Sequence, residues 1–281
     1  MSKCLVTMMM VILLVGCQTG TDLPQPEAEG TNQTNEAVEK EQDLELEEVV
    51  EKSEQDEYNP EEFEEVDERQ LEPRYRINEG NWRVEPIDDA DKKVVLLTID
   101  DAPENYSVDM AKTLSELGVN AIFFINGHFL DEEGREHLKT IHELGFQIGN
   151  HTMTHPNLRD LAPEEQREEI VALNDLIEEI IGERPRFFRA PFGANTDVSK
   201  QVSKEEGMQW MNWTYGYDWE PEYMDADALA DIMVNTNLLS DGANILMHDR
   251  EWTKDALPEI IKGIREQGYT FVDPTEIKSN E

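Results

Sequence analysis

Cysteine and positive charge are both scarce in this sequence of 281 residues. Its two cysteines, Cys4 and Cys17, lie near the N-terminus, so no thiol after Cys17 is left to form a disulfide. Stability must therefore come from a hydrophobic core. The 24 lysines and arginines stand against 63 aspartates and glutamates, which gives a formal net charge of −39. This balance excludes nucleic acid and anionic lipid as partners held by charge, because both would be repelled.

Apolar runs long enough to cross a membrane comfortably are also lacking. The run from about Cys4 to Val15 is too short for that, so residues 1–16 are predicted to be a secretory signal. The run ends in Leu-Val-Gly-Cys, which resembles the bacterial lipobox. That resemblance implies cleavage before Cys17, a lipid on Cys17, and an extracytoplasmic protein anchored to the bacterial cell membrane. The alternative is an ordinary cysteine in a discarded signal.

Residues 17–71 are dense in acids and poor in apolar side chains, as the stretches 43–48 and 60–65 illustrate. Such a segment buries too little surface to offset the entropy lost on ordering, and its like charges extend it. We expect a disordered acidic linker that tethers the rest of the chain. A partner-binding role is the alternative.

From about residue 72 onward, short apolar runs alternate with amphipathic stretches, a pattern typical of α/β proteins with parallel strands. The clearest helix is Pro163–Ile181, which has proline in its first turn and ends before a glycine. A barrel and an open sheet both fit. Strands are expected over residues 94–99, 121–126, 146–150, 187–190, 209–214, 244–247 and 269–272. The other helices are expected over residues 108–117, 132–144, 197–206, 226–239 and 257–267.

Polar residues follow five of these strands at or near the point where each one ends. In parallel α/β architectures ligands collect at the carboxyl ends of the strands, because the loops there converge. We therefore expect these residues to share one rim of the molecule. They are the pair Asp100 and Asp101, then His151, Arg189, Asp218 and His248.

The adjacent carboxylates Asp100 and Asp101 repel each other unless a cation or a base lies close. His151 and His155 are four residues apart and can face one cation. Two histidines and one carboxylate, with positions left open for water and substrate, are the ligand type of catalytic zinc and related divalent metals. The second aspartate is then free to act as a base toward activated water. The alternatives are a simple turn at the aspartates and a surface pair of histidines.

Three further rim residues suit the same chemistry. Arg189 offers a fixed positive fork that would hold a carboxylate base ionised and oriented, although an ordinary salt bridge is the alternative. His248 is placed to deliver a proton to a leaving group, and Asp218 to orient it or raise its pKa. A histidine that ends a strand is more often structural, so this interpretation depends on the shared rim.

Taken together, the motifs resemble those of the polysaccharide deacetylases of carbohydrate esterase family 4, also called the NodB homology domain, over roughly Lys92 to Ile277. The resemblance implies a distorted (β/α)7 barrel and makes residues 72–281 the catalytic domain. The matching segments occur in the order of that family and are Thr98-Ile99-Asp100-Asp101-Ala102, His151-Thr152-Met153-Thr154-His155, Arg189-Ala190-Pro191-Phe192-Gly193 and Leu246-Met247-His248.

The resemblance also implies a role for each matched residue. Asp100 is the catalytic base, Arg189 positions it, and His248 is the catalytic acid. The backbone N–H that follows Pro191, which belongs to Phe192, helps to bind the oxyanion. The implied ligands of a divalent metal ion, zinc or another, are Asp101, His151 and His155.

This sequence departs from the family pattern in two places. Ala102 replaces the usual glycine, which constrains the turn mildly. The fourth motif keeps Asp218 and Trp219 but lacks an upstream aspartate common in the family, and it is more similar to the peptidoglycan deacetylase branch. Asp218 is expected to be the partner of His248. Trp219 and Tyr217 are expected to form walls that face the sugar, with aromatic core packing as the alternative.

The expected protein is a monomeric, lipid-anchored, metal-dependent hydrolase that removes N-acetyl groups from amino sugars of cell-wall polysaccharide, peptidoglycan above all. One alternative keeps the fold without turnover and acts as a cell-wall-binding lipoprotein. Another shares the chemistry but hydrolyses acetyl esters on a different polysaccharide.

Overall fold

The computed structural model describes residues 72–279. The expected signal, the lipidation of Cys17 and the acidic linker lie outside these residues. Among the residues that the structure does describe, no helix is both long enough and apolar enough to cross a membrane.

The centre of the molecule is a seven-stranded sheet in which every strand pair is parallel. Its strands follow one another in the order β7-β6-β5-β4-β3-β8, and β9 pairs with β3. This parallel arrangement confirms the α/β class that the sequence indicates. The strands are β3 (Val94–Ala102), β4 (Ile122–Ile125), β5 (Gln147–Asn150), β6 (Phe187–Phe188), β7 (Gln209–Trp210), β8 (Ala243–His248) and β9 (Thr270–Phe271).

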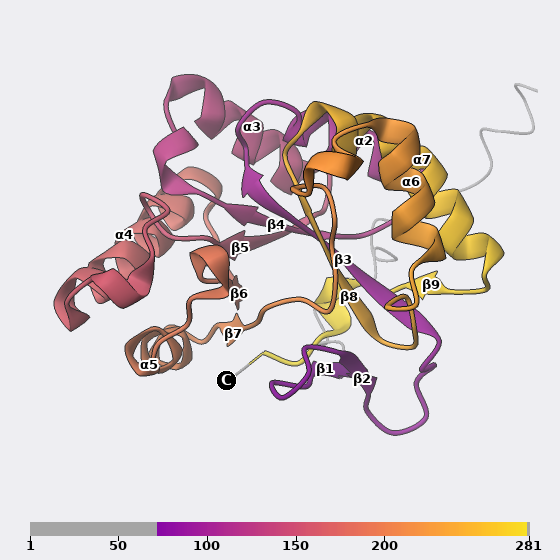
Figure 1. The fold of residues 1–281 in the computed structure, drawn as a ribbon. Coiled ribbons are helices and arrows are strands. Elements are labelled where there is room, and N and C mark those ends of the chain that lie inside the picture. Colours follow the sequence, from indigo (N-terminus) through magenta and orange to yellow (C-terminus); the bar gives the residue numbers. More distant parts are fainter. Residues whose placement is uncertain (1–71, 280–281) are drawn as a thin grey trace, which may run out of the picture. The chain divides into compact units, whose positions relative to one another are not determined.

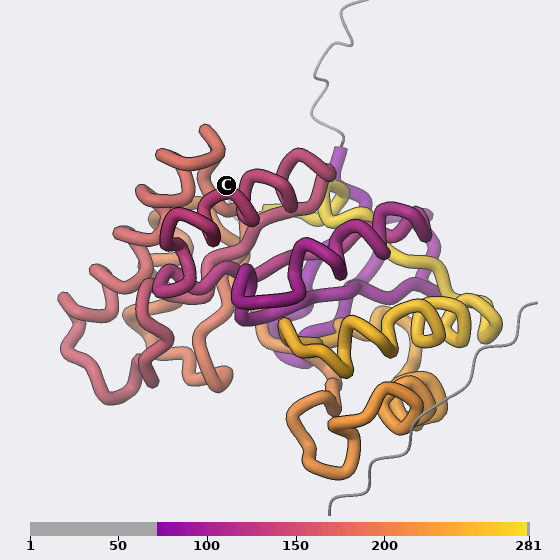
Figure 2. Tube along the Cα trace, turned by 90° about the horizontal axis from the view of Figure 1, so that it is seen from above, coloured from indigo at the N-terminus to yellow at the C-terminus, as the bar shows by residue number. Residues whose placement is uncertain are grey.

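Within residues 72–279, six α-helices cover the sheet. Helices that follow neighbouring strands pack against each other, so the helices have the same spatial order as the strands. In Figures 1 and 2, α2 lies between α3 and the yellow α7, which packs against α6, while α3 leads on through α4 to α5. The helices are α2 (Ser107–Glu116), α3 (Glu132–Glu143), α4 (Pro163–Ile181), α5 (Asp197–Glu205), α6 (Ala226–Asn235) and α7 (Glu251–Glu266). Short 3-10 helices are η1 (Gly127–Phe129), η2 (Leu158–Asp160), η3 (Pro191–Gly193), η4 (Pro221–Tyr223) and η5 (Pro274–Glu276).

The sheet curls into an irregular ring because the segment after β7 runs beside β8. Tyr215 forms an isolated parallel bridge with Ile245. The Thr214 N–H donates to the carbonyl of Asn244, and the Leu246 N–H donates to the carbonyl of Tyr215. This short contact replaces a full strand pairing, so the expected distorted (β/α)7 barrel is confirmed.

A two-stranded antiparallel hairpin, β1 (Tyr75–Ile77) and β2 (Val84–Pro86), precedes the barrel and has no counterpart among the predicted strands. It lies at the amino end of β8, where the Val84 N–H donates to the carbonyl of Gly242. Tyr75, Ile77 and Val84 join a buried cluster with the strands. Each strand has only three residues, too few to show an alternating apolar pattern in the sequence.

The alternation of side chains along β3 explains why the Asp100 side chain points into the barrel. Val95, Leu97 and Ile99 belong to the cluster that the helices cover. Leu96 belongs to the cluster that includes the hairpin. Because side chains of a strand alternate between its two faces, Thr98 and Asp100 continue the series of Leu96. Asp100 is consequently buried, with 2% of its surface exposed.

Three predicted boundaries were wrong by four residues or more. Strand β7 ends at Trp210, because the chain then turns toward β8 instead of continuing along β6. Helix α6 ends at Asn235, since Thr236 adopts an extended conformation. Helix α7 begins at Glu251 and holds Pro258 in its interior, although proline usually marks a first turn. The residues thereby added to α7 include Trp252 and Thr253, which reach the site described next.

Candidate active site

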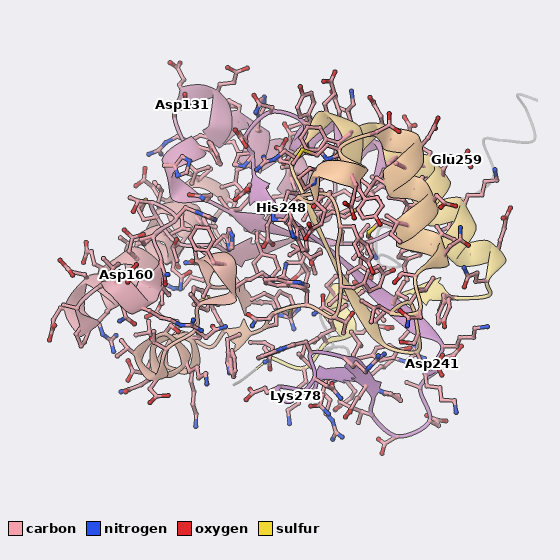
Figure 3. All side chains as sticks on the ribbon, in the orientation of Figure 1. Asp131, Asp160, Asp241, His248, Glu259 and Lys278 are labelled. Atoms are coloured by element: carbon pink, nitrogen blue, oxygen red, sulfur yellow. The ribbon has the colours of Figure 1, made fainter. Side chains whose placement is uncertain are left out.

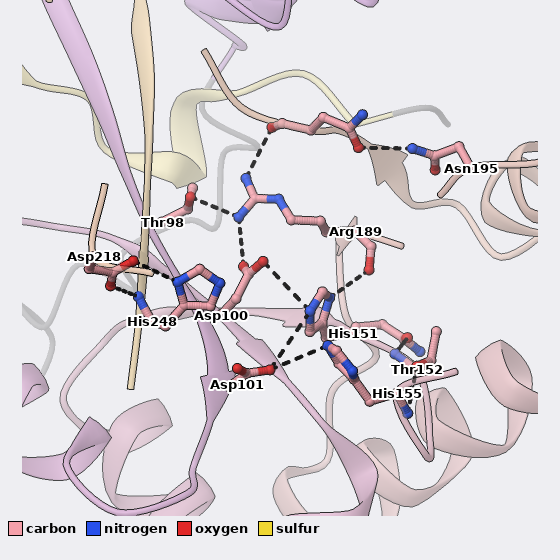
Figure 4. Close-up of polar contacts among 12 residues, drawn as sticks. Thr98, Asp100, Asp101, His151, Thr152, His155, Arg189, Asn195, Asp218 and His248 are labelled. Atoms are coloured by element: carbon pink, nitrogen blue, oxygen red, sulfur yellow. Dashed lines mark hydrogen bonds and ion pairs between the residues drawn. The ribbon is translucent and has the colours of Figure 1, made fainter. Parts of the chain in front are cut away.

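Polar side chains from the carboxyl ends of the strands converge on a cavity of about 550 Å³. In the view of Figure 3, His248 lies near the middle of the molecule, whereas Asp131 and Glu259 lie at its edge. Of the rim residues that the sequence indicates, all except Arg189 line the cavity, and Arg189 lies beneath them, fully buried. Figure 4 shows their polar contacts.

Asp100 and Arg189 form a buried ion pair. Arg189 Nη1 donates to Asp100 Oδ1 at 2.6 Å and to the hydroxyl of Thr98 at 2.9 Å, and Nη2 donates to the carbonyl of Asn212 at 3.1 Å. The guanidinium also lies 4.3 Å from the ring centre of Phe124. Burial lowers the pKa of Arg189, and the charge and hydrogen bond of Asp100 oppose this shift. The arginine therefore holds the Asp100 carboxylate in one orientation.

Asp101, His151 and His155 form a group whose ligand atoms lie within 4.8 Å of one another. Asp101 Oδ1 lies 3.5 Å from His155 Nε2 and 4.0 Å from His151 Nε2. Two ligands bound about 2.0–2.2 Å from one ion lie roughly 3–3.5 Å apart, so the group needs only a small contraction to hold a divalent metal.

The tautomer of His151 also suits a metal ligand. Its Nδ1 lies 2.8 Å from the carbonyl oxygen of Arg189, which can only accept a hydrogen bond. Nδ1 therefore carries a proton, and in the neutral ring a metal ligand requires, Nε2 offers its lone pair on the side of Asp101. One carboxylate and two imidazoles leave coordination positions open, which is typical of catalytic sites.

The loop that carries the two histidines is held by helix α4. The side chain of Asn150 donates to Asn174 Oδ1 and accepts from the Thr152 N–H. Glu169 accepts from both the N–H and the hydroxyl of Thr154. These contacts fix the backbone between His151 and His155, so the spacing of the imidazoles is built into the fold.

The charges of this group influence one another. Burial alone would raise the pKa of Asp101, but His151, His248, His155 and Arg250 outweigh it and lower the pKa. Burial and the neighbouring His151 lower the pKa of His155. Both shifts favour the protonation states that a metal requires, an ionised carboxylate and a neutral imidazole.

His248 and Asp218 form a second pair on the other side of Asp100. His248 Nδ1 lies 2.8 Å from Asp218 Oδ1, and the His248 N–H donates to Asp218 Oδ2 at 2.6 Å. The Thr253 hydroxyl donates to the same oxygen, and Trp252 Nε1 donates to the Asp218 carbonyl. Burial opposes protonation of His248, but the hydrogen bond and charge of Asp218, with Asp100 and Asp101, raise its pKa.

Left-handed backbone conformations concentrate at the site. Asp101, Thr152, His155 and Phe192 have φ values of +62°, +70°, +58° and +58°. For residues other than glycine this region is costly, by about 1–3 kcal/mol each, and is retained where surrounding contacts fix the chain. The conformation of Asp101 turns the chain sharply after Asp100, so two adjacent carboxylates serve different neighbours.

Two aromatic side chains flank the histidines. The Phe192 ring lies 4.9 Å from that of His155 and is 69% exposed, while Trp219 lies 5.4 Å from His248 and is 39% exposed. Both line the cavity. Pro191 is buried beneath Phe192 in η3. Tyr217 is not part of the described lining, because its hydroxyl is hydrogen-bonded to Thr236 and its ring packs on neighbouring tyrosines.

Sequence reasoning missed several residues of the site. Thr98 and Asn212 hold Arg189, and Thr253 holds Asp218. Asp249 and Arg250 immediately follow His248, and this adjacency was the only signal that could have found them. The buried Asp249 carboxylate accepts hydrogen bonds from the backbone N–H groups of residues 105 and 106, just before α2, and from the N–H and hydroxyl of Ser107, its first residue.

The fold and the site together define an α/β-barrel hydrolase with a candidate metal centre at the carboxyl ends of its strands. The polysaccharide deacetylase family matches residues 87–211. A peptidoglycan-N-acetylglucosamine deacetylase of Bacillus cereus is 31% identical over 194 residues, which cover 64% of this chain and 69% of that protein. The chain belongs to the polysaccharide deacetylase family, which includes hydrolases of amide bonds such as this Bacillus cereus deacetylase.

Solved structures are similar as well. The peptidoglycan deacetylase PdaC from Bacillus subtilis is 30% identical, with a TM-score of 0.58 over 66% of this chain and 91% of that one. A family 4 carbohydrate esterase pseudoenzyme from Bacillus anthracis is also 30% identical, with a TM-score of 0.59 over 64% of this chain and 63% of that one. The fold therefore carries both active and inactive proteins, and activity must be argued from the residues of the site.

Proposed function

We propose that this protein is a metal-dependent deacetylase that hydrolyses the N-acetyl group of amino sugars in peptidoglycan. The observation that carries the proposal is the placement of three candidate metal ligands, a carboxylate base and a paired histidine around one cavity. The similarity to peptidoglycan deacetylases of two Bacillus species supports the choice of substrate.

The residues of the metal group fit a divalent ion such as zinc, held by Asp101, His151 and His155. A bound ion would supply Lewis acidity, which polarises the amide carbonyl and lowers the pKa of water. Asp100 lies next to this group, with Oδ2 3.6 Å from His151 Nε2, and accepts the proton of the attacking water. Arg189 donates to Asp100 at 2.6 Å and so orients the carboxylate for that step.

His248 acts on the leaving group. Its raised pKa favours the protonated imidazole, and Asp218 holds Nδ1 so that Nε2 donates to the departing amine. The backbone N–H of Phe192 donates to the oxyanion that forms when water adds to the carbonyl. Water and the amide bond are consumed, and acetate and a free amino sugar are released.

The exposed aromatic rings suit a sugar substrate. Phe192 and Trp219 stand on either side of the histidines and offer apolar faces on which pyranose rings pack. With these walls beside it, the acetamido group reaches the space between Asp100 and His248. Peptidoglycan glycan strands and chitin oligomers share this group, so the walls alone do not choose between them.

Acetate release from peptidoglycan, chitin oligomers and acetyl-xylan tests the substrate. We expect release from peptidoglycan by the wild type and none by Asp100→Asn, which serves as the matched inactive control. A greater rate on acetyl-xylan would favour the ester-hydrolase alternative. Binding to peptidoglycan without acetate release from any substrate would favour a non-catalytic wall-binding protein, which the similarity to a pseudoenzyme makes a relevant second candidate.

We also propose that Cys17 carries the lipid that anchors the protein outside the cytoplasm, on the strength of its lipobox-like sequence. Partition of the wild type into the detergent phase, and of Cys17→Ser into the aqueous phase, is the expected result. Equal partition of both proteins would contradict the anchor and leave the deacetylase proposal unaffected.

A further inference from the structure

Arg250 contacts the outer side of the candidate metal group. Its Nη2 donates to Asp101 Oδ2 at 2.9 Å, and its Nη1 donates to Glu104 Oε2 at 2.7 Å. The side chain lines the cavity and is 34% exposed. None of the motifs that identify the family includes this residue, and it has no part in the proton transfers proposed above.

The two oxygens of Asp101 therefore have different partners. Oδ1 faces His155 Nε2 at 3.5 Å, whereas Oδ2 is held by Arg250. A carboxylate can rotate about its last side-chain bond, and Asp101 also has a left-handed backbone conformation. A hydrogen bond to Oδ2 is what stops that rotation and leaves Oδ1 turned toward the histidines.

Arg250 is itself firmly placed. Its Nη1 also donates to the Asp249 carbonyl at 2.8 Å. The Asp249 carboxylate is fully buried and caps helix α2, while the Asp249 N–H donates to the Asp100 carbonyl at 3.1 Å. The residues after β8 thus contact the end of β3 and the loop that follows it at three points, and the contact made by Arg250 is the one to a candidate metal ligand.

We propose that Arg250 is a positioning residue that fixes Asp101 in the orientation required to bind the metal. This inference rests on the proposed function, because it takes Asp101 as a metal ligand. Hydrogen-bonding partners of metal ligands typically change metal affinity by about 10–100-fold when they are removed.

The positive charge of Arg250 works in the opposite direction, since it repels a cation. Solvent reaches the side chain and screens this repulsion, whereas the hydrogen bond to Asp101 acts at contact distance. Orientation is therefore expected to dominate. The two effects predict opposite changes in zinc affinity for Arg250→Gln, which removes both the positive charge and the guanidinium group. Loss of orientation would weaken zinc binding, whereas loss of the repulsion would strengthen it.

The experiment measures zinc affinity of the metal-stripped full chain by competition with a chromophoric chelator. We expect Arg250→Gln to bind zinc at least tenfold more weakly than the wild type. Arg250→Lys keeps the charge but cannot bridge Asp101 and Glu104, so its affinity should also fall. Arg135→Gln is the matched control, because Arg135 pairs with Glu179 on the outside of the protein, and its affinity should be unchanged.

Equal or tighter zinc binding by Arg250→Gln would overturn the inference, even if the wild type is an active deacetylase. Weaker binding by Arg250→Gln together with a wild type that releases no acetate would support the positioning role and reject the proposed activity. Circular dichroism on each variant separates loss of affinity from loss of fold. A wild type that binds no zinc would overturn both proposals.

Discussion

At the scale of single residues, the site separates two adjacent carboxylates by giving them different partners. Asp100 pairs with Arg189 inside the barrel, whereas Asp101 pairs with Arg250 and faces His155. Both carboxylates lie within 4.0 Å of His151 Nε2. The sequence placed both aspartates at the end of a strand and indicated that one binds a metal and the other acts as a base, and the family resemblance assigned each role to its residue. The alternation of β3 and the left-handed turn at Asp101 give that division a physical cause.

Asp100→Asn and Asp101→Asn should therefore lose activity for different reasons. Asp100→Asn should keep zinc affinity within a few fold and lose roughly 10²–10⁴-fold in kcat, because only the base is removed. It should also lower the free energy of unfolding, by up to about 3–5 kcal/mol, since Arg189 loses its buried counter-charge. Asp101→Asn should instead lose zinc affinity. Calorimetric zinc titration beside acetate assays checks both, and identical behaviour of the two variants would contradict the assignment.

The pH profile tests the pair of His248 and Asp218. The proposed acid must be protonated, and its pKa is raised in the folded protein, so the rate should fall only as pH rises through a value above about 6.5. Asp218→Asn removes the negative charge that raises this pKa and leaves at most a weaker, neutral hydrogen bond, so burial then lowers the pKa. The alkaline limb of kcat/KM should move to lower pH in that variant. An unmoved limb would show that His248 is not the acid.

The pH dependence of the free energy of unfolding tests the pair of His248 and Asp218 independently. A pKa that is raised on folding contributes stability below the unfolded value, and that contribution is lost as pH rises through the folded value. The difference in unfolding free energy between wild type and Asp218→Asn should consequently be largest below about pH 6.5 and should shrink toward alkaline pH. Chemical denaturation at several pH values measures it, and a difference independent of pH would argue against the linkage.

At the scale of elements, Asp249 links the loops after β3 and β8 through hydrogen bonds. Its carboxylate satisfies N–H groups at the start of α2 that have no partner within the helix. Asp249→Asn replaces one acceptor oxygen by an NH2 group, which cannot accept a hydrogen bond from those N–H groups. The free energy of unfolding should therefore fall by about 1–3 kcal/mol. Thermal and urea unfolding are the measurements.

Asp131→Asn is the control for that prediction. Asp131 caps α3 locally by accepting from the Gly134 N–H, and asparagine caps a helix about as well as aspartate. Its unfolding free energy should stay within a few tenths of a kcal/mol of the wild type. Equal losses in the two variants would mean that Asp249 is an ordinary cap and not a clamp between two loops.

The longest helix was predicted with its bounds, and the strands of the main sheet were found from their apolar runs, but the hairpin was not predicted. The apolar pattern and end signals of Pro163–Ile181 sufficed to give its bounds, and the run from Val94 gave β3 its start. Strands β1 and β2 were missed, because three residues carry no detectable period. The first turns of α7 were hidden by Pro258, and Thr253 was hidden with them. Arg250 lay beyond reach because its role depends on a contact across 149 residues.

At the scale of the whole molecule, the parallel barrel collects side chains from distant parts of the chain at one cavity. The sequence indicated this convergence from strand ends alone, and the described barrel brings Asp100, Asp101, His151, His155, Asp218 and His248 together. What sequence could not give is the support beneath them, since hydrogen bonds such as that from Arg189 to the Asn212 carbonyl leave no trace in composition or spacing.

The rate of acetate release from peptidoglycan, measured as zinc is added back to the metal-stripped full chain, tests the central claim most directly. We predict no release before addition, a rise that saturates at one ion per chain, and no rise in Asp101→Asn at the same zinc concentrations. Full activity of the stripped protein, or no acetate at any zinc concentration, would contradict metal-dependent deacetylation.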